Sequence, residues 1–371
     1  MPPVNIIGAG VVGLSVGWQL ARQGRAVAIY ERGEAGRATS WLAAGMLAPD
    51  AEIGFEEQVL YVLNRESARR WPEFAAALEE ESGRKVDFRT EGTLTVAHDR
   101  DASEALRRRF EFMKESGLQV EWLSGAEALD LEPFVAPRLA AAVFSRNDRQ
   151  VDNRLLVDAL REAFVRKGGE LHEHAPVRAI APDETAPQII LEDGERIYGS
   201  AVVVAAGAWS RQIEGLEADE RPPVRPVKGQ MLELLVEPPF DLRHVVRGPR
   251  AYLAPKTNGR LLVGASSEEM GFDERVTAGG LYRLLEGAWE IVPGIHDLPV
   301  VDMWAGLRPA SRDHLPILGF GEAPGVVMAT GFYRHGILLT PVTSEEIARL
   351  IITEKMSDWL QPFSPLRFVT E

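Results

Sequence analysis

The chain has 371 residues, of which 45% are apolar and none is cysteine, and its net charge is −14. This length and apolar content are typical of a globular protein of about two domains with a large core. The acidic charge argues against nucleic acid and anionic membranes as partners, and the lack of cysteine excludes disulfides, thiolate metal sites, iron–sulfur clusters and a catalytic thiol.

The sequence offers no segment for a membrane span or an export signal. Its longest apolar run covers residues 201–209, far short of the ~20 residues that a membrane span needs. The first predicted strand begins at Val4, which leaves no room for a leader peptide. We therefore expect a soluble, cytoplasmic protein without a membrane partner.

The first thirty-one residues carry a nucleotide-binding pattern. Residues 4–7 predict a buried strand, and Gly8-Ala9-Gly10-Val11-Val12-Gly13 then matches G-x-G-x-x-G. A helical pattern that stops at Gly24 and a strand over 26–30 that ends in Glu31 complete the unit. The glycines allow a tight turn, close approach of a pyrophosphate and helix–strand packing, and the acid can accept hydrogen bonds from a ribose. The motif leaves open whether the dinucleotide is NAD or FAD.

The remaining elements are predicted from periodicity and turn signals. A loop of small residues, 36–46, suits the close approach of backbone to a flat ligand. Helices are expected over 55–81, 102–116, 152–167 and 336–352, and strands over 88–96, 120–123, 140–144, 177–180, 188–191, 201–207, 230–236, 252–255, 260–264 and 326–329. We expect the stretch 227–300 to be rich in strands.

Strands for the nucleotide-binding sheet thus come from three separate stretches, with strand-rich segments between them. This order predicts an α/β protein of two interleaved domains. A Rossmann-like nucleotide-binding domain would comprise 1–80, 148–220 and 302–371, and a mixed-sheet α+β substrate domain 81–147 and 221–301.

Motifs along nearly the whole chain carry a family resemblance. They are Thr39-Ser40, Ala44-Gly45-Met46-Leu47, Val203-Val204-Ala205-Ala206-Gly207-Ala208-Trp209-Ser210, Pro226-Val227-Lys228-Gly229-Gln230, Tyr252-Leu253-Ala254-Pro255, Gly259-Arg260-Leu261-Leu262-Val263-Gly264-Ala265, Trp304-Ala305-Gly306-Leu307-Arg308-Pro309 and Gly331-Phe332-Tyr333-Arg334-His335-Gly336-Ile337-Leu338-Leu339. With the glycine turn and Glu31, the chain resembles the D-amino-acid oxidase superfamily of flavoproteins, in particular glycine oxidases and, more distantly, sarcosine oxidases. The glycine triplet is shared with many unrelated enzymes, whereas the arginine-centred motifs are specific.

The resemblance implies non-covalently bound FAD on the Rossmann-like domain. Backbone N–H groups of residues 336–338, at the start of the last predicted helix, would stabilise the negative charge of reduced flavin; a plain turn into the helix is the alternative. The implied cofactor-binding residues are Gly8, Gly10, Val11, Val12, Gly13, Glu31, Arg32, Thr39, Ser40, Ala44, Gly45, Met46, Val177, Ala206, Gly207, Trp209, Gly331, Phe332, Tyr333, Arg334, His335, Gly336, Ile337 and Leu338.

Four residues are implied at the substrate. Arg308 would clamp a carboxylate through its two-pronged guanidinium, and Tyr252 would add its hydroxyl. Arg334 would face the substrate from the flavin side, and Met46 would form an apolar wall. A surface ion pair for Arg308 and ordinary packing for Tyr252 and Met46 are the alternatives.

Arg250 departs from the family pattern, because glycine oxidases can carry a histidine two residues before the tyrosine. We expect Arg250 to add positive charge beside the clamp, with Arg247 and His244 near it in sequence. Such charge would suit a second substrate carboxylate, as in iminodiacetate. A side chain that points into solvent is the alternative.

The implied reaction is oxidation of the CH–NH bond of glycine or a small N-substituted glycine. Hydride passes to the flavin, the imine hydrolyses to glyoxylate and an amine or ammonia, and oxygen is reduced to hydrogen peroxide. Positioning and electrostatics would carry catalysis without a side-chain base. Sarcosine, iminodiacetate or a small D-amino acid as substrate, a flavin dehydrogenase with another electron acceptor, an NAD-linked dehydrogenase and a non-catalytic nucleotide-binding protein remain open. The family also suggests a homo-oligomer.

Overall fold

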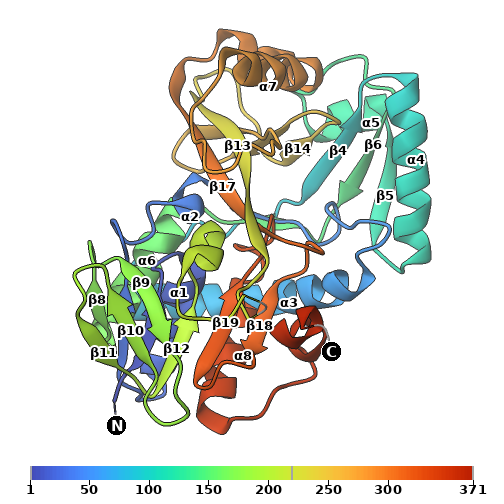
Figure 1. Cartoon of the computed structure of the whole chain (residues 1–371). Helices are drawn as coiled ribbons and strands as arrows, with labels where there is room; N and C mark the ends of the chain where they lie inside the picture. The colour runs from blue at the N-terminus through green and yellow to red at the C-terminus, as the bar shows by residue number, and fades with distance from the viewer. Residues whose placement is uncertain (1, 219, 370–371) are drawn as a thin grey trace.

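The computed structural model describes residues 2–218 and 220–369 and forms two lobes, each built on its own sheet (Figure 1). The strands of the six-stranded sheet are, in spatial order, β18 (Ile317–Phe320), β19 (Val326–Thr330), β12 (Ala201–Val204), β1 (Val4–Ile7), β2 (Val27–Tyr30) and β8 (Glu170–His172). All neighbours pair in parallel except β18 and β19. The apolar runs of β1, β2 and β12 are buried throughout, as parallel strands covered on both faces require.

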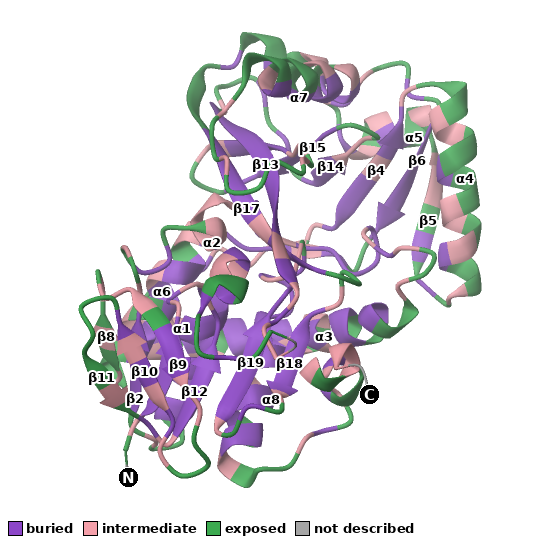
Figure 2. Cartoon of the chain, viewed as in Figure 1, coloured by how far each residue is buried: buried purple, intermediate pink, exposed green. Residues whose placement is uncertain are grey.

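Two different layers cover this sheet (Figure 2). Helices pack on one face, and they are α1 (Val11–Arg22), α3 (Gln58–Ser82), α6 (Asn153–Arg166) and α8 (Thr340–Thr353). On the other face lies an antiparallel sheet of β9 (Val177–Ala181), β10 (Gln188–Leu191) and β11 (Arg196–Tyr198). The first lobe is therefore a Rossmann-like α/β unit, as the sequence predicts.

The second lobe is built on a mixed, mainly antiparallel sheet of eight strands. In spatial order they are β17 (Val300–Ser311), β13 (Val224–Leu235), β16 (Arg260–Gly264), β15 (Tyr252–Pro255), β14 (Val245–Arg247), β4 (Thr93–Ala97), β6 (Ala141–Ser145) and β5 (Val120–Ser124). The helices of this lobe are α4 (Arg100–Glu115), α5 (Gly125–Leu131) and α7 (Ala278–Ile291). Only β14 and β4 pair in parallel among the described strands of this sheet.

Short elements join the lobes. Helix α2 (Thr39–Leu42) and strand β3 (Met46–Leu47) follow the first βαβ unit, and β3 pairs with β7 (Arg149–Gln150).

The remaining short elements are the 3₁₀ turns η1 (Gly207–Gln212), η2 (Pro293–Asp297), η3 (Gln361–Phe363) and η4 (Pro365–Phe368). None of the helices in the described ranges is long and apolar enough to span a bilayer.

Three sequence expectations differ from the structure. The stretch 227–300 contains α7, which the strand-rich interpretation omits. The last long helix begins at Thr340 and not at Gly336. The expected domain boundary at residue 302 falls inside β17, a continuous strand that pairs with β13 over its whole length. Strand β17 therefore belongs to the eight-stranded sheet, and a boundary at residue 302 would cut it.

The packing of α1 against the turn after β1 depends on Gly13, because a Cβ there would lie 1.9 Å from Gly8 O. We expect Gly13→Ala to destabilise the apoprotein by about 2 kcal/mol or more, since the helix must move off the strand. The urea-unfolding midpoint measures this loss. Gly33→Ala is the matched control, because nothing lies within 4 Å of a Cβ at Gly33. Equal midpoints for the two variants would contradict the packing argument.

Candidate active site

A cavity of about 440 Å³ runs from the carboxyl ends of β1, β2 and β12 to strands β13, β15 and β17 of the second sheet. Ligands of parallel α/β sheets bind at this edge, where the loops after neighbouring strands meet. The cavity therefore has a nucleotide end, formed by the Rossmann-like lobe, and a second end under the mixed sheet.

The turn after β1 leaves the N-terminus of α1 open to an anion. Gly8 has a φ of +101°, and a Cβ there would lie 2.6 Å from Ala205 O. Gly10 is the N-cap of α1 and has no side-chain capping hydrogen bond, and the first turn holds no acidic residue. Val11 N donates to Ser40 Oγ at 3.0 Å. The remaining N–H groups of the first turn and the positive end of the helix dipole suit a pyrophosphate.

Glu31 lies at the end of β2 with its carboxylate held in place. Its Oε2 accepts a hydrogen bond from Ala9 N at 2.8 Å, and its Oε1 accepts one from Gly33 N at 3.1 Å. Beside it, the Arg32 guanidinium lies 3.6 Å from the ring centroid of Trp209. The site fits the ribose and pyrophosphate of a dinucleotide. It offers the fixed carboxylate of Glu31, the Arg32–Trp209 pair and the N-terminus of α1.

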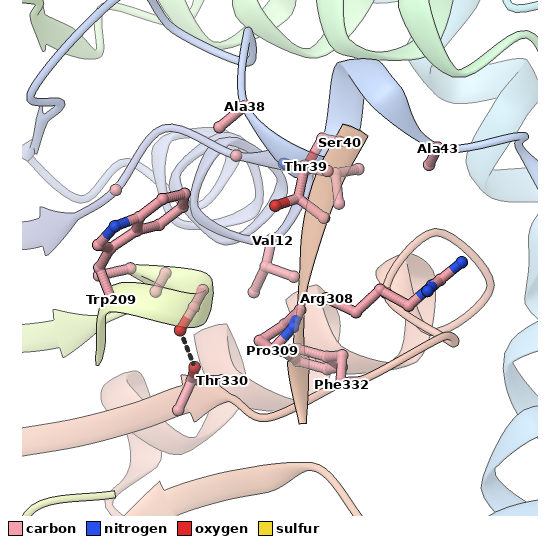
Figure 3. A pocket seen from close by; sticks show the side chains of 18 of the residues that line it. Val12, Ala38, Thr39, Ser40, Ala43, Trp209, Arg308, Pro309, Thr330 and Phe332 are labelled. Atoms are coloured by element: carbon pink, nitrogen blue, oxygen red, sulfur yellow. Dashed lines mark hydrogen bonds between the residues drawn. The ribbon is translucent and has the colours of Figure 1, made fainter. Parts of the chain in front are cut away.

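The structure brings most of the expected cofactor-binding residues to the cavity. Those that line it are Gly8, Gly10, Val11, Val12, Glu31, Arg32, Thr39, Ser40, Ala44, Gly45, Met46, Val177, Ala206, Gly207, Trp209, Phe332, Tyr333, Arg334, Gly336 and Ile337. Figure 3 shows Thr39 and Ser40 between Trp209 on one side and Arg308 on the other. The cavity thus joins segments that are far apart in the sequence.

Four expected cofactor-binding residues lie outside the cavity lining. Gly13 packs beneath the turn, and Gly331 turns the chain after β19 with a φ of +76°. His335 is buried beside Glu52, and Leu338 O accepts hydrogen bonds from the side chains of α3.

The helix start expected at residues 336–338 lies later in the chain, whereas the expected role of their N–H groups towards the flavin stays a prediction, since these groups donate to no protein acceptor in the described ranges. The N-cap of α8 is Leu339, and the residues before it form a series of turns. The apolar pattern over 336–352 runs through these turns into the helix, so it does not mark where the helix begins.

Arg308 projects from β17 into the second end of the cavity (Figure 3). Its Nη1 donates to Ser266 O at 2.9 Å, and no carboxylate among the described residues pairs with it. A Cβ at Gly229, on the neighbouring strand, would lie within 2.5 Å of the guanidinium. The guanidinium of Arg308 can occupy this position because Gly229 has no side chain. With no carboxylate partner among the described residues, it is available to bind an anion.

Tyr252 and Met46 line the same end of the cavity. Burial raises the pKa of Tyr252 to about 12, although the charge of Arg308 opposes the rise. The phenol is therefore a protonated donor at neutral pH. Its oxygen lies 3.7 Å from the sulfur of Met231, and a Cβ at Gly264 would lie 2.5 Å from it.

An ion pair that the sequence analysis does not anticipate stands beside the clamp. Glu52 lines the cavity and pairs with Arg247. Burial alone would raise the pKa of Glu52, but the charges of Arg247, His335 and Arg334 lower it to about 2. Glu52 lies in an irregular segment before α3, where no periodic pattern marks it, and only its closeness to the Ala-Gly-Met motif could have pointed to it.

Arg250 lies away from the carboxylate clamp, contrary to the expectation from its place in the sequence. Its side chain pairs with Glu286 at 2.7 Å and with Glu290, both on α7, and it is outside the cavity lining. Because α7 is missing from the sequence prediction, these partners could not be foreseen. Arg334 does line the cavity, 3.7 Å from Glu57.

Comparisons with known proteins agree with this site. A family model for FAD-dependent oxidoreductases matches residues 4–350. The glycine oxidase of Geobacillus kaustophilus (strain HTA426) is 35% identical over 368 residues, which cover 99% of this chain and 97% of that protein. The crystal structure of glycine oxidase from Geobacillus kaustophilus matches with a TM-score of 0.92 and 34% identity, covering 100% of this chain and 99% of that one.

A second solved structure is also similar over its full length. The crystal structure of iminodiacetate oxidase from Chelativorans sp. BNC1 matches with a TM-score of 0.88 and 28% identity, covering 98% of each chain. The family match explains the C-terminal arginine motifs, which an NAD-linked dehydrogenase does not. The chain therefore belongs to the family of FAD-dependent oxidoreductases and uses FAD as its cofactor.

Proposed function

We propose that the enzyme oxidises the CH–NH bond of glycine or a small N-substituted glycine, with oxygen as the electron acceptor. The products are glyoxylate, ammonia or an amine, and hydrogen peroxide. The observation that carries the proposal is the Arg308 guanidinium in the cavity, which pairs with no carboxylate in the described part of the chain, with the Tyr252 phenol in the same cavity lining. The full-length similarity to glycine oxidases supports the same substrate class.

The side chains of the cavity position the substrate. Arg308 binds the substrate carboxylate through two N–H groups, and Tyr252 donates to the same carboxylate. Met46 and Met231 add apolar surface to the cavity lining, which limits the room for a large substituent. When bound, FAD supplies the acceptor for the hydride of the substrate α-carbon. Fixed orientation of that carbon is the main contribution of the protein.

None of the titratable groups described above fits the role of a general base. Glu52 has a pKa of about 2 and Tyr252 one of about 12, so the first is too weak a base and the second stays protonated. Burial lowers the pKa of His335, but this ring lies outside the cavity lining. We therefore propose that the substrate amine loses its proton to solvent before the hydride leaves.

Iminodiacetate is a second candidate substrate. Arg334 is a further cation in the cavity lining, and its nearest carboxylate, that of Glu57, is 3.7 Å away. A second substrate carboxylate could pair with it. Arg247 does not serve this role, because Glu52 already neutralises it.

We also propose that the enzyme is a cytoplasmic homo-oligomer. The outer face of α7 supports contact between copies, because Tyr282, Leu285 and Trp289 are exposed there at helical spacing. The mass of the purified enzyme, measured by light scattering, tests the oligomeric state.

The first prediction concerns the reaction itself. Without oxygen, glycine should bleach the flavin absorbance of the purified enzyme, and in air the same mixture should form peroxide at the rate of turnover. Sarcosine, iminodiacetate and D-alanine complete the substrate panel. Bleaching without peroxide would show a dehydrogenase, and no bleaching by any of the four would overturn the proposal.

The second prediction concerns the carboxylate clamp. Arg308→Lys should lower kcat/KM for glycine by about 100-fold, because a lysine cannot make the two-pronged pair. FAD binding, measured by ultrafiltration, should not change. Arg312→Lys, at an exposed position just after β17, is the matched control and should keep full activity. Equal activity of both variants would remove Arg308 from the site.

The third prediction concerns pH. The kcat/KM value should rise with pH and level off near the pKa of the substrate amine, because only the neutral amine reacts. Two substrates whose amines differ in pKa should show inflections that differ by the same amount. An inflection at one fixed pH for both substrates would instead reveal a base on the enzyme.

A further inference from the structure

We name residues 39–46 the cradle segment, and all of them except Trp41 line the FAD cavity. Most of their carbonyl groups accept hydrogen bonds from residues outside the segment. The acceptors come from five of the six residues 40–45, and the donors come from outside the segment. The bonds are Asn153 Nδ2 to Ser40 O (3.0 Å) and Trp41 O (2.7 Å), Trp304 Nε1 to Leu42 O (2.9 Å), Lys256 Nζ to Ala44 O (2.7 Å) and Val151 N to Gly45 O (2.9 Å).

The Lys256 bond fixes the direction of one peptide group. In a planar trans peptide the C=O and the N–H point in opposite directions. Because Ala44 O points at Lys256, the Gly45 N–H points away from it. This N–H donates to no other protein group in the described ranges, and both residues line the cavity. Gly45 has a φ of +73°, and a Cβ there would lie 2.2 Å from Val151 O.

Lys256 itself is buried behind the cradle segment, with 4% of its surface exposed. Its Nζ also donates to Val151 O at 2.7 Å and to Gln150 Oε1 at 3.1 Å. Three acceptors match the three hydrogens of an ammonium, whereas a neutral amine has only two. The bonding pattern is therefore that of the charged form.

The groups around Lys256 act on its pKa in opposite directions. Burial lowers the pKa of Lys256 to about 7. Asp152 and Asp87 favour the charged form, and Arg89 and Arg260 oppose it. A positive charge directly behind a peptide polarises it and makes its N–H a stronger donor.

We propose that Lys256 is a positioning residue of the FAD site: it holds Ala44 O on the far side of the peptide, so that the polarised Gly45 N–H donates to bound FAD and stabilises the negatively charged, reduced cofactor. Preorganised donors of this kind stabilise charge that develops during a reaction. The inference rests on FAD binding by the family and not on the proposed amino-acid substrate. A wrong substrate assignment would therefore not overturn it.

Two variants test the proposal. Lys256→Met keeps the length and removes the charge and the donors, and Lys256→Arg keeps the charge. For Lys256→Met, we expect a tenfold loss of affinity for the reduced cofactor relative to the oxidised one, which lowers the two-electron midpoint potential by about 30 mV. Lys256→Arg should recover most of this potential. Calorimetric titration of the folded apoproteins with FAD measures the accompanying loss of oxidised-FAD affinity in Lys256→Met.

Lys228→Met is the matched control. Lys228 is also fully buried and lies on β13 of the same sheet, but its Nζ has no hydrogen-bond partner among the described residues. The midpoint potential of the flavin in Lys228→Met should equal that of the unmodified enzyme. An unchanged potential in Lys256→Met, or an equal shift in both variants, would overturn the proposal.

A measurement on the unmodified enzyme keeps the proposal testable if Lys256→Met does not fold. Above pH 7 the reduction should draw a proton onto Lys256, so the midpoint potential should fall more steeply with pH there. The break should be absent in Lys256→Arg, whose guanidinium stays charged. A potential whose pH dependence is the same in both proteins would contradict the role of Lys256.

Discussion

The antiparallel pairing of β13 with β17 is the interaction on which the site depends. The two twelve-residue strands pair from Val224 with Ser311 to Leu234 with Val300, and they run between the two lobes (Figure 1). This ladder brings Arg308 and the residues around it to a cavity whose other end is built by the first residues of the chain. Without it, the nucleotide end and the substrate end would be two separate surfaces.

The electrostatics of the site contrast with those of the whole chain. The protein carries a net charge of −14, but Arg308, Arg334 and Arg247 gather around one end of the cavity. Glu52 neutralises Arg247, and Glu57 lies near Arg334, which leaves Arg308 as the strongest local attraction for an anion. A small carboxylate can therefore bind at Arg308 although the protein as a whole is acidic.

Much of the Rossmann-like lobe could be predicted from the sequence because its signals are local. The glycine turn, the strand before it and Glu31 lie within thirty-one residues, and each has a single physical role. Arg308 has no such local signal, and only the resemblance of its motif to the family pointed to it. Helix α7 was missed because Gly280 and Gly287, which are poor helix formers, lie within it. Their missing side chains make room for Gln230 and Arg250, and no local pattern reveals such a need.

The pairing of Glu52 with Arg247 shows a second limit of prediction from sequence. The two residues are far apart in the sequence, and each alone reads as an ordinary surface charge. Only the fold places them side by side, where both are buried and the charge of Arg247 helps to lower the pKa of Glu52 against the effect of burial. The placement of Arg250 has the same origin, because its partners lie on the helix that local patterns missed.

The sulfur chemistry of the cavity has a consequence for the lifetime of a peroxide-forming enzyme. The chain has no thiol that peroxide could oxidise, but the thioethers of Met46 and Met231 line the cavity in which peroxide would form. Oxidation would turn these apolar side chains into polar sulfoxides and change the shape of the substrate end. Thiol reductants, which reverse disulfides, would not restore such an enzyme, whereas a methionine sulfoxide reductase would.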